Sequence, residues 1–313
     1  PAYKAGLKAK DKIMSIDKKP TKDMALEEAV SLIRGKGGTK VTLGILRGKW
    51  KEPKDYSIVR AKITIKSVEK KLLDGNIGYV KLNTFENQKA ARDMRAALEE
   101  MNEKQAKGLI LDLRNNGGGL LGNAIDIGGL FMQRGVIVYT IDREKHKEAI
   151  YSDGEPVWTR PLVVLVNGAS ASASEILAGA IQDNKRGSLI GEKTFGKASV
   201  QNIHSLSDGS AVLITVAKYL TPGGRDITKK GIEPDILVKV PTEEANGEAA
   251  DEKIDETLPD EAKDIQLKKA LEIIKKKISS YETPQYRYIV GSRNEFRISG
   301  RIGSRSLVPL AGA

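Results

Sequence analysis

The 313-residue sequence predicts an α/β protein: a core with a mixed, largely parallel sheet and flanking helices, preceded by a small α+β block. Two patterns support this prediction. Between residues 63 and 240, short apolar segments of strand length alternate with longer segments of helical periodicity, as in sheets whose parallel strands are joined by helices. Before residue 63, one amphipathic helical segment is followed by strands that alternate apolar and polar residues.

The N-terminal block, residues 1–62, contains a predicted helix at 24–34 and two predicted strands. Leu26, Ala29, Val30 and Ile33 recur at helical spacing and would form one apolar face. The segments VTLGILR (41–47) and YSIVRA (56–61) alternate apolar and polar side chains, which predicts half-buried strands. This combination indicates a small α+β unit.

The core, residues 63–240, opens with a predicted strand at 77–82, a helix at 86–103 and the apolar strand GLILDL at 108–113. A glycine-rich turn, a helix at 123–133 and a strand at 136–141 follow. The apolar run LVVLV (162–166), a helix at 173–185 and a strand at 188–191 come next. A hairpin is predicted around Asp208 and Gly209, since Asp-Gly between alternating segments is a strong turn signal.

The C-terminal region divides into two further parts. Residues 241–262 are acidic and predict a loose linker, and 263–278 predict a Lys-rich helix with the apolar positions Ile265, Leu267, Leu271, Ile274 and Ile278. Together, residues 241–283 are interpreted as an acidic linker and C-terminal helix. Residues 284–313 carry five Arg and no clear period, and are interpreted as a non-native or disordered tail.

The net charge of +11 does not predict a nucleic-acid-binding protein, because the charge is divided along the chain. Residues 1–70 hold 18 Lys and Arg against 8 Asp and Glu, whereas residues 241–262 hold 9 acids against 1 Lys. The lysines are dispersed at helix and strand spacing, which is typical of a solvated surface. No apolar run approaches the roughly 18 residues of a membrane span.

The turn after LVVLV is the first candidate for chemistry. It reads NGASASASE (167–175), with Ser172 between a predicted strand and a predicted helix. Such a turn exposes a hydroxyl beside the unpaired N–H groups and the dipole of a helix N-terminus. Small residues also occur wherever a helix packs tightly on a sheet, so the turn alone leaves a structural role open.

A serine nucleophile needs a base, and Lys197 is the best candidate. The chain has no Cys, and its two histidines, His146 and His204, have no obvious partners in the sequence. Lys197 lies in EKTFGKASVQ, 25 residues after Ser172, and Gln201 follows four residues later. A lysine accepts a proton only as the neutral amine, whose fraction is small at a pKa of about 10.4, so such a site must lower the pKa.

Residues 1–240 resemble the carboxyl-terminal processing peptidases, or tail-specific proteases, a family of Ser/Lys peptidases that carry a PDZ domain. The resemblance rests on LDLRNNGGG (111–119), PLVVLVNGASASASEILAGAIQD (161–183), GEKTFGKASVQ (191–201), DGSAVLITVAKYLTPGGRDI (208–227) and KGIEPDI (230–236). The segment PAYKAGLKAKDKIMSID, with the helix and GKGGTKVTLGILR after it, resembles the second part of a PDZ domain. Residues 1–62 are therefore expected to form a partial PDZ domain.

The resemblance implies a serine endopeptidase with a specific set of site residues. Ser172 would be the nucleophile, Lys197 the base and Gln201 the residue that orients the lysine. The backbone N–H groups of Gly119 and Ala173 would form the oxyanion hole, with Gly118 as the neighbouring alternative. Ser170 and Ser174 would be supporting residues.

The family also implies partners and a compartment. The expected substrates are unfolded polypeptides or chains with exposed, nonpolar C-termini, captured through the PDZ domain. An extracytoplasmic location, in the periplasm or cell envelope, follows from resemblance alone. No cofactor, metal or nucleic acid is expected, while peripheral membrane association and homo-oligomerisation remain open.

Two other functions compete with the peptidase. Gly117, Gly119 and Gly122 satisfy G-x-G-x-x-G, and Asp142 follows 20 residues later, which is a dinucleotide-binding pattern of an oxidoreductase. That alternative leaves Ser172 and Lys197 unexplained. A non-catalytic peptide-binding scaffold with the peptidase fold is the second alternative, and a serine-directed probe would distinguish it.

Overall fold

The computed structural model describes residues 1–240 and 263–282, apart from 9–10, 64–65, 153 and 208–209. Its strands form three sheets, with the orders β2-β1-β3-β4, β14-β11-β10-β7-β6-β5 and β12-β13-β8-β9. The acidic segment 241–262 and the tail 283–313 lie outside the described residues. The predictions for both remain untested.

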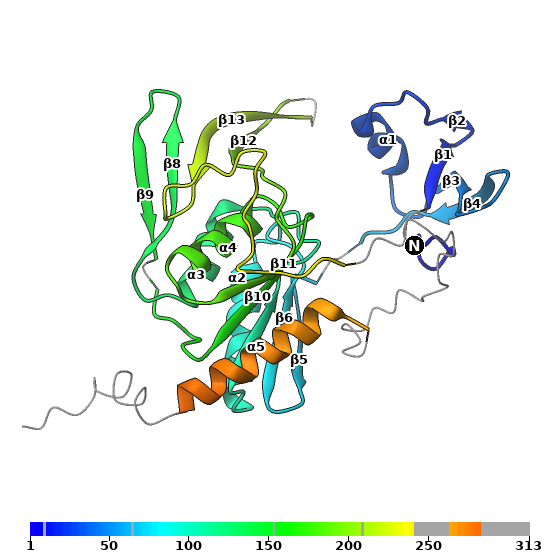
Figure 1. The fold of residues 1–313 in the computed structure, drawn as a ribbon. Helices are drawn as coiled ribbons and strands as arrows, with labels where there is room; N and C mark the ends of the chain where they lie inside the picture. The colour runs from blue at the N-terminus through cyan, green and yellow to red at the C-terminus, as the bar shows by residue number, and fades with distance from the viewer. Residues whose placement is uncertain (9–10, 64–65, 153, 208–209, 241–262, 283–313) are drawn as a thin grey trace, which may run out of the picture.

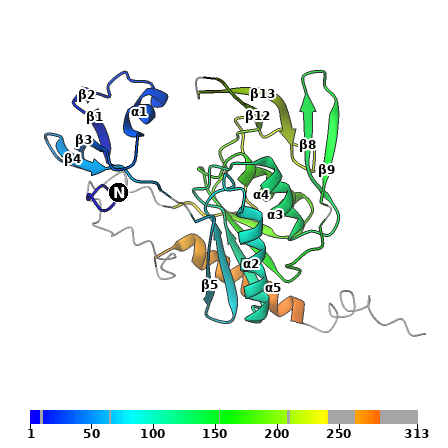
Figure 2. The same ribbon diagram turned by 180° about the vertical axis from the view of Figure 1, so that it is seen from behind.

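The N-terminal block is a separate lobe in Figures 1 and 2. It consists of β1 (Lys12–Ile16), β2 (Lys19–Pro20), α1 (Leu26–Ile33), β3 (Lys40–Leu46) and β4 (Lys54–Val59). All its strand pairs are antiparallel. Alternate residues of β3, namely Val41, Leu43 and Ile45, are buried, so the sequence pattern correctly predicted a half-buried sheet.

The central sheet is mixed and largely parallel, which confirms the predicted fold class. Its strands are β5 (Val68–Leu73), β6 (Ile77–Leu82), β7 (Gly108–Asp112), β10 (Leu162–Val166), β11 (Ser188–Gly191) and β14 (Ile236–Leu237). Only the β5–β6 pair is antiparallel; the pairs β6–β7, β7–β10, β10–β11 and β11–β14 are parallel. The carboxyl ends of β7 and β10 therefore meet at one edge.

Helices cover both faces of this sheet (Figures 1 and 2). On one face lie α2 (Ala90–Glu103), α3 (Leu121–Gly129) and α4 (Ala173–Asp183), and on the other lies α5 (Ile265–Glu282). Val164 and Val166 of β10 pack on the first face, whereas Val163 and Leu165 pack on the second. Burial on both faces explains why LVVLV is apolar at every position.

The third sheet was not predicted as a separate unit. It contains β8 (Val136–Asp142), β9 (Lys147–Tyr151), β12 (Ser199–Ser205) and β13 (Ala211–Leu220), paired antiparallel throughout. Strands β12 and β13 pair antiparallel, as the predicted hairpin requires, while Asp208 and Gly209 themselves lie outside the described residues. Strands β1, β2, β5, β9 and β14 were also absent from the sequence prediction.

Helix α5 matches its predicted position but not every predicted contact. Leu267, Ile274 and Ile278 are buried against the central sheet as expected, together with Ala270. Ile265, predicted on the apolar face, is 39% exposed. It occupies the first position of the helix.

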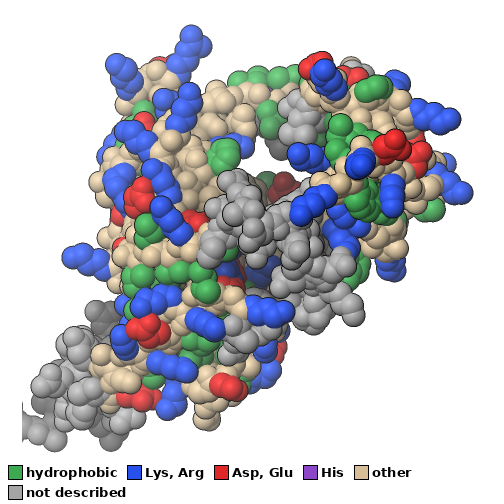
Figure 3. Space-filling view, turned by 45° about the vertical axis from the view of Figure 1, so that its right-hand side comes forward, with side chains coloured by type: hydrophobic (Ala, Val, Ile, Leu, Met, Phe, Trp, Pro, Cys, Tyr) green, Lys and Arg blue, Asp and Glu red, His purple; other side chains and the backbone are tan. Residues whose placement is uncertain are grey.

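Lysine and arginine side chains are spread over the face seen in Figure 3, with acidic groups among them. This distribution agrees with the prediction that the basic residues are dispersed. Among the described helices, none combines the length and apolar character that a membrane span requires.

Candidate active site

Ser172 lies between the end of β10 and the start of α4, as the sequence predicted. Its backbone is in an unusual conformation, with φ 56° and ψ −116°. A residue other than glycine rarely adopts positive φ, and such strain is typical of sharp strand-to-helix turns that expose a nucleophile. The side chain is half-buried and sits at the positive end of the α4 dipole.

The glycine-rich turn after β7 packs directly on the Ser172 turn. At Gly118, with φ 100°, an added Cβ would lie 2.7 Å from the Ala171 carbonyl oxygen and 2.9 Å from the Ala173 nitrogen. At Gly119, with φ 142°, it would lie 2.3 Å from the Glu86 nitrogen. Side chains are therefore excluded at both positions, and at Gly118 the backbone packs directly on the Ser172 turn.

Two backbone N–H groups of this region have no hydrogen-bond acceptor among the described residues. Within the described part of the chain, neither the Gly119 N–H nor the Ala173 N–H donates a hydrogen bond. The Gly118 N–H, by contrast, donates to the Asn116 side chain at 2.9 Å. Free N–H groups at Gly119 and Ala173 are what the expected oxyanion pair requires, whereas the Gly118 N–H is already engaged.

Ser170 and Ser174 are buried and hold the two turns together. The Ser170 hydroxyl donates to the Leu113 carbonyl at 2.9 Å, and the Ser174 hydroxyl donates to the Asn116 carbonyl at 2.9 Å. Both hydroxyls are thus engaged with the main chain of the glycine-rich segment. Their positions fit supporting roles and leave Ser172 as the accessible hydroxyl of the run.

Glu175 links the Ser172 turn to the Lys197 segment. Its buried carboxylate accepts four hydrogen bonds, two at each oxygen. Oε2 accepts from the Ser172 N–H and the Lys197 N–H, each at 2.9 Å, so the two nitrogens are at most about 5.8 Å apart. Oε1 accepts from the Thr194 hydroxyl at 2.6 Å and the Gly196 N–H at 2.7 Å. Residues 25 positions apart in sequence are therefore neighbours in space.

Tyr219 links the same two residues through their carbonyl groups. Its buried hydroxyl, on β13, lies 3.2 Å from the Ser172 carbonyl oxygen and also contacts the Lys197 carbonyl oxygen. Burial, followed by the nearby Glu175 carboxylate, raises the pKa of Tyr219, so the group remains a neutral donor. The main chains of Ser172 and Lys197 are consequently fixed at both their N–H and C=O groups.

The side chains of Lys197 and Gln201 are less confined than their main chains. Both are exposed, and no hydrogen bond joins Lys197 to the Ser172 hydroxyl or to the Gln201 amide among the described residues. Gln201 lies on β12, beside an irregularity in the β12–β13 pairing between Val200 and Gln201. The structure thus brings the Lys197 backbone close to Ser172, but the Lys197 amine forms no hydrogen bond with the Ser172 hydroxyl.

Arg114, at the start of the glycine-rich turn, ties the end of β7 to the segment before α5. Its guanidinium forms ion pairs with Asp112, at 2.6 Å, and with Asp264, at 2.7 Å. Burial acts to lower the Arg114 pKa, but the two carboxylates outweigh it and raise that pKa above its ordinary value. Asp264 immediately precedes α5, so this network connects the edge near Ser172 to the helix on the opposite face.

The dinucleotide-binding alternative does not fit the fold. In that motif, the acid ends a strand of the same parallel sheet as the glycine turn. Asp142 instead ends β8, which belongs to the antiparallel sheet β12-β13-β8-β9. Gly119, the middle glycine of the motif, also packs on the Glu86 backbone, where the motif requires space for a pyrophosphate.

His146 has a partner in the structure, although none was obvious in the sequence. Its Nδ1 lies 3.0 Å from Asp142, and ligand atoms of Asp142, Glu144 and His146 lie within 4.8 Å of one another. Glu144 and His146 are exposed. Exposed groups of this kind are common without a bound ion, so we assign no metal to them.

Sequence analysis missed two residues that organise the site, Glu175 and Tyr219. Glu175 had a local signal, because Ser-x-x-Glu at a helix start is a capping pattern in which the acid accepts the first backbone N–H. Tyr219 had none. It reaches Ser172 only through the pairing of β13 with other strands.

The geometry agrees with comparisons to known proteins. Residues 76–238, more than half of the chain, match the family model of peptidase family S41. The chain belongs to peptidase family S41. Residues 1–46 of this S41 chain match the PDZ domain family, in agreement with the expected N-terminal unit.

Relatives of this S41 chain include proteins named carboxyl-terminal processing proteases. One from Synechocystis sp. is 45% identical over 245 residues, covering 77% of this chain and 57% of the relative. The protease CtpA of Bacillus subtilis is 42% identical over 242 residues, covering 77% and 52%. The solved photosystem II D1 C-terminal processing protease is 37% identical with a TM-score of 0.63, covering 76% of this chain and 66% of that one. The S41 chain thus spans little more than half the length of these curated relatives.

Proposed function

We propose that this chain is a serine endopeptidase of the C-terminal processing type, with Ser172 as nucleophile, Lys197 as base and Gln201 as the residue that orients the base. The observation that supports it most directly is the shared carboxylate of Glu175. One oxygen accepts the main-chain N–H of both Ser172 and Lys197. The protein thereby places a hydroxyl and an amine, from distant parts of the sequence, on neighbouring backbone.

In the proposed mechanism, Ser172 Oγ attacks the scissile carbonyl carbon while the Lys197 amine takes the hydroxyl proton. Negative charge develops on the carbonyl oxygen, beside the uncommitted Gly119 and Ala173 N–H groups. When the C–N bond breaks, Lys197 returns its proton to the leaving amine. Water then hydrolyses the acyl ester and regenerates the Ser172 hydroxyl.

This mechanism requires the exposed Lys197 side chain to turn toward Ser172. The two amide nitrogens are at most about 5.8 Å apart, and lysine has a flexible four-carbon stem. A change of side-chain rotamer is a small rearrangement, and the main chain needs no movement for it. Gln201, four residues beyond Lys197, would accept a hydrogen bond from the amine without adding a charge that favours its protonated form.

The natural substrates we propose are unfolded polypeptides or proteins with exposed, nonpolar C-termini. The PDZ match at residues 1–46 supports recognition of a chain end. The relatives are named for processing at the carboxyl terminus. An extracytoplasmic site of action is part of the same proposal and follows from the family resemblance.

Digestion of an unfolded model protein tests the proposal. The chain should cleave it at internal peptide bonds, and Ser172→Ala should not. Ser170→Ala serves as a matched control, because its buried hydroxyl contacts a carbonyl away from the proposed reaction and some cleavage should remain. A serine-directed fluorophosphonate should label Ser172 alone. Equal cleavage by the Ser172→Ala protein would contradict the assignment, and absence of both labelling and cleavage would favour the non-catalytic scaffold.

A further inference from the structure

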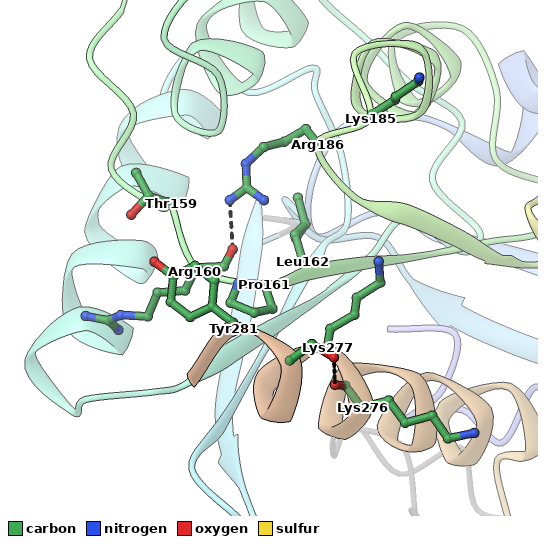
Figure 4. A pocket seen from close by; sticks show the side chains of 10 residues that line it. Thr159, Arg160, Pro161, Leu162, Lys185, Arg186, Lys276, Lys277 and Tyr281 are labelled. Carbon is green, nitrogen blue, oxygen red and sulfur yellow. Dashed lines mark hydrogen bonds between the residues drawn. The ribbon is translucent and has the colours of Figure 1, made fainter. Parts of the chain in front are cut away.

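A cavity of about 480 Å³ lies at the opposite end of the central sheet from Ser172. Three separate segments line it: the approach to β10, the chain just after α4 and the last turns of α5. Figure 4 shows Leu162 and Tyr281 at its apolar wall. A volume of this size is within the range of small-molecule sites in proteins.

The charge of the lining is one-sided. Its cationic side chains are Arg160, Lys185, Arg186, Lys276 and Lys277, and its described lining contains no Asp or Glu. Lys276 is paired with Glu272 at 2.7 Å and points away from the cavity in Figure 4. Lys277, one residue on, is half-buried and rises from α5 beside Leu162.

Arg186 differs from Arg114, another half-buried arginine. Arg114 is paired with two carboxylates. Arg186 has only main-chain partners: Nε donates to Phe131 at 2.8 Å, and Nη2 donates to Trp158 at 2.7 Å and Arg160 at 2.9 Å. Its Nη1 donates to none of the described residues. Burial without a carboxylate lowers the pKa of Arg186 to about 10, as expected for a cation whose charge is not balanced locally.

We propose that this cavity binds the phosphate group of a small organic phosphate. Arg186 Nη1 supplies a donor whose position is fixed by the other hydrogen bonds of the guanidinium. The Lys277 ammonium, on its flexible stem, supplies a second charge-assisted donor for the phosphate oxygens. Pro161, Leu162 and the ring of Tyr281 supply an apolar wall for the organic part of the ligand. The same group is present in a soluble metabolite and in a phospholipid headgroup, so the two sources share one recognition chemistry.

Calorimetric titration with phenyl phosphate tests the proposal on the full chain. We expect one saturable site with a Kd below about 1 mM, and no comparable heat from phenol or from sodium chloride at equal ionic strength. Lys277→Ala should weaken binding at least tenfold. Lys275→Ala, an exposed lysine of the same helix outside the cavity, should leave it unchanged.

Equal weakening by both substitutions would overturn the proposal, because it would show diffuse attraction to a basic surface. Absence of phenyl phosphate binding by a folded protein would overturn it too. Sedimentation with phosphatidylglycerol and phosphatidylcholine vesicles separates the sources. Binding to the anionic vesicles that phenyl phosphate displaces and Lys277→Ala removes would identify a headgroup, and phenyl phosphate binding alone would identify a soluble ligand. Since none of these readouts is proteolysis, the result is independent of the proposed peptidase activity.

Discussion

The Ser172 turn and the Lys197 segment carry the two halves of the proposed dyad, and they are built differently. Around Ser172, buried hydroxyls, glycines without room for a side chain and the Glu175 carboxylate fix the backbone. Around Lys197, the main chain is held by Glu175 and Tyr219, but the side chain is exposed. In the proposed mechanism, this difference corresponds to a preorganised nucleophile and oxyanion hole and to a base whose side chain moves on a fixed backbone.

The largest expected effect is that of Lys197→Ala, which tests the Lys197 segment, whose side chain is free to move. Cleavage should fall by at least about 10³-fold, because nothing else would take the Ser172 proton. The melting temperature should stay within about 2 °C, since an exposed side chain contributes little to stability. Cleavage of an unfolded protein and thermal unfolding followed by circular dichroism measure the two effects. Full activity in this variant would remove Lys197 from the mechanism.

Glu175→Gln should damage both halves together. The amide can accept at one oxygen only, so its NH₂ group would face two of the four donors that now surround the carboxylate. We expect the free energy of unfolding to fall by about 3 kcal/mol and cleavage by at least about 100-fold. Denaturant titration and kinetic assays check both. Glu233→Gln, at a side chain that is 66% exposed, is the matched control and should change neither.

Gly118→Ala tests the Ser172 turn alone, without changing the Lys197 segment. The added Cβ would meet the Ala171 and Ala173 backbone, and φ is 100°, so the turn must shift at a cost of about 1–3 kcal/mol. We expect cleavage to fall about tenfold or more as the oxyanion donors move. Gly117→Ala is the control, because a Cβ there meets nothing within 4 Å. If both glycine variants retain full activity, the turn is not preorganised in the sense proposed.

The smallest effect is expected from Tyr219→Phe, which removes one hydroxyl from the link between the halves. Phenylalanine fits the same space, so stability should change by only about 1–2 kcal/mol. We expect kcat to fall about three- to tenfold with KM little changed, because the hydroxyl contacts the backbone of the two proposed catalytic residues and not substrate. Steady-state kinetics separates the two parameters. Tyr151→Phe, at a side chain that is 61% exposed, should behave as the parent protein.

The parts of the site that sequence predicted are those with local signals. Ser172 stands between an apolar run and a helical pattern, and the glycines at 117–119 mark a turn that needs unusual backbone angles. Lys197 was predicted as the base because the sequence offers no Cys and no His with an obvious partner, and the orienting role of Gln201 came from the family resemblance. Their proximity to Ser172 is created by Glu175 hydrogen bonds between segments that no periodicity connects.

The fold shows the same limit. Strands buried on both faces, such as β10, were predicted because every residue in them is apolar. The grouping of β8 and β9 with β12 and β13 was not predicted, since the paired residues of β8 and β13, such as Asp142 and Ala217, are far apart in sequence and neither segment carries a local signal of the pairing. Tyr219 is an extreme case, because its contact with Ser172 depends on that pairing.

The positive φ of Ser172 affects the choice of an inactive protein for trapping a bound peptide. Alanine has the same steric penalty as serine at positive φ. Ser172→Ala should therefore preserve the conformation of the turn, with the same strain energy as the parent protein. Glycine would relieve that penalty, so it should raise the melting temperature while allowing the backbone of the Ser172 turn to adopt other conformations. The Ser172→Gly protein would then be the more stable variant but the less faithful copy of the parent backbone. Ser172→Ala is therefore the better variant for crystallising a bound peptide.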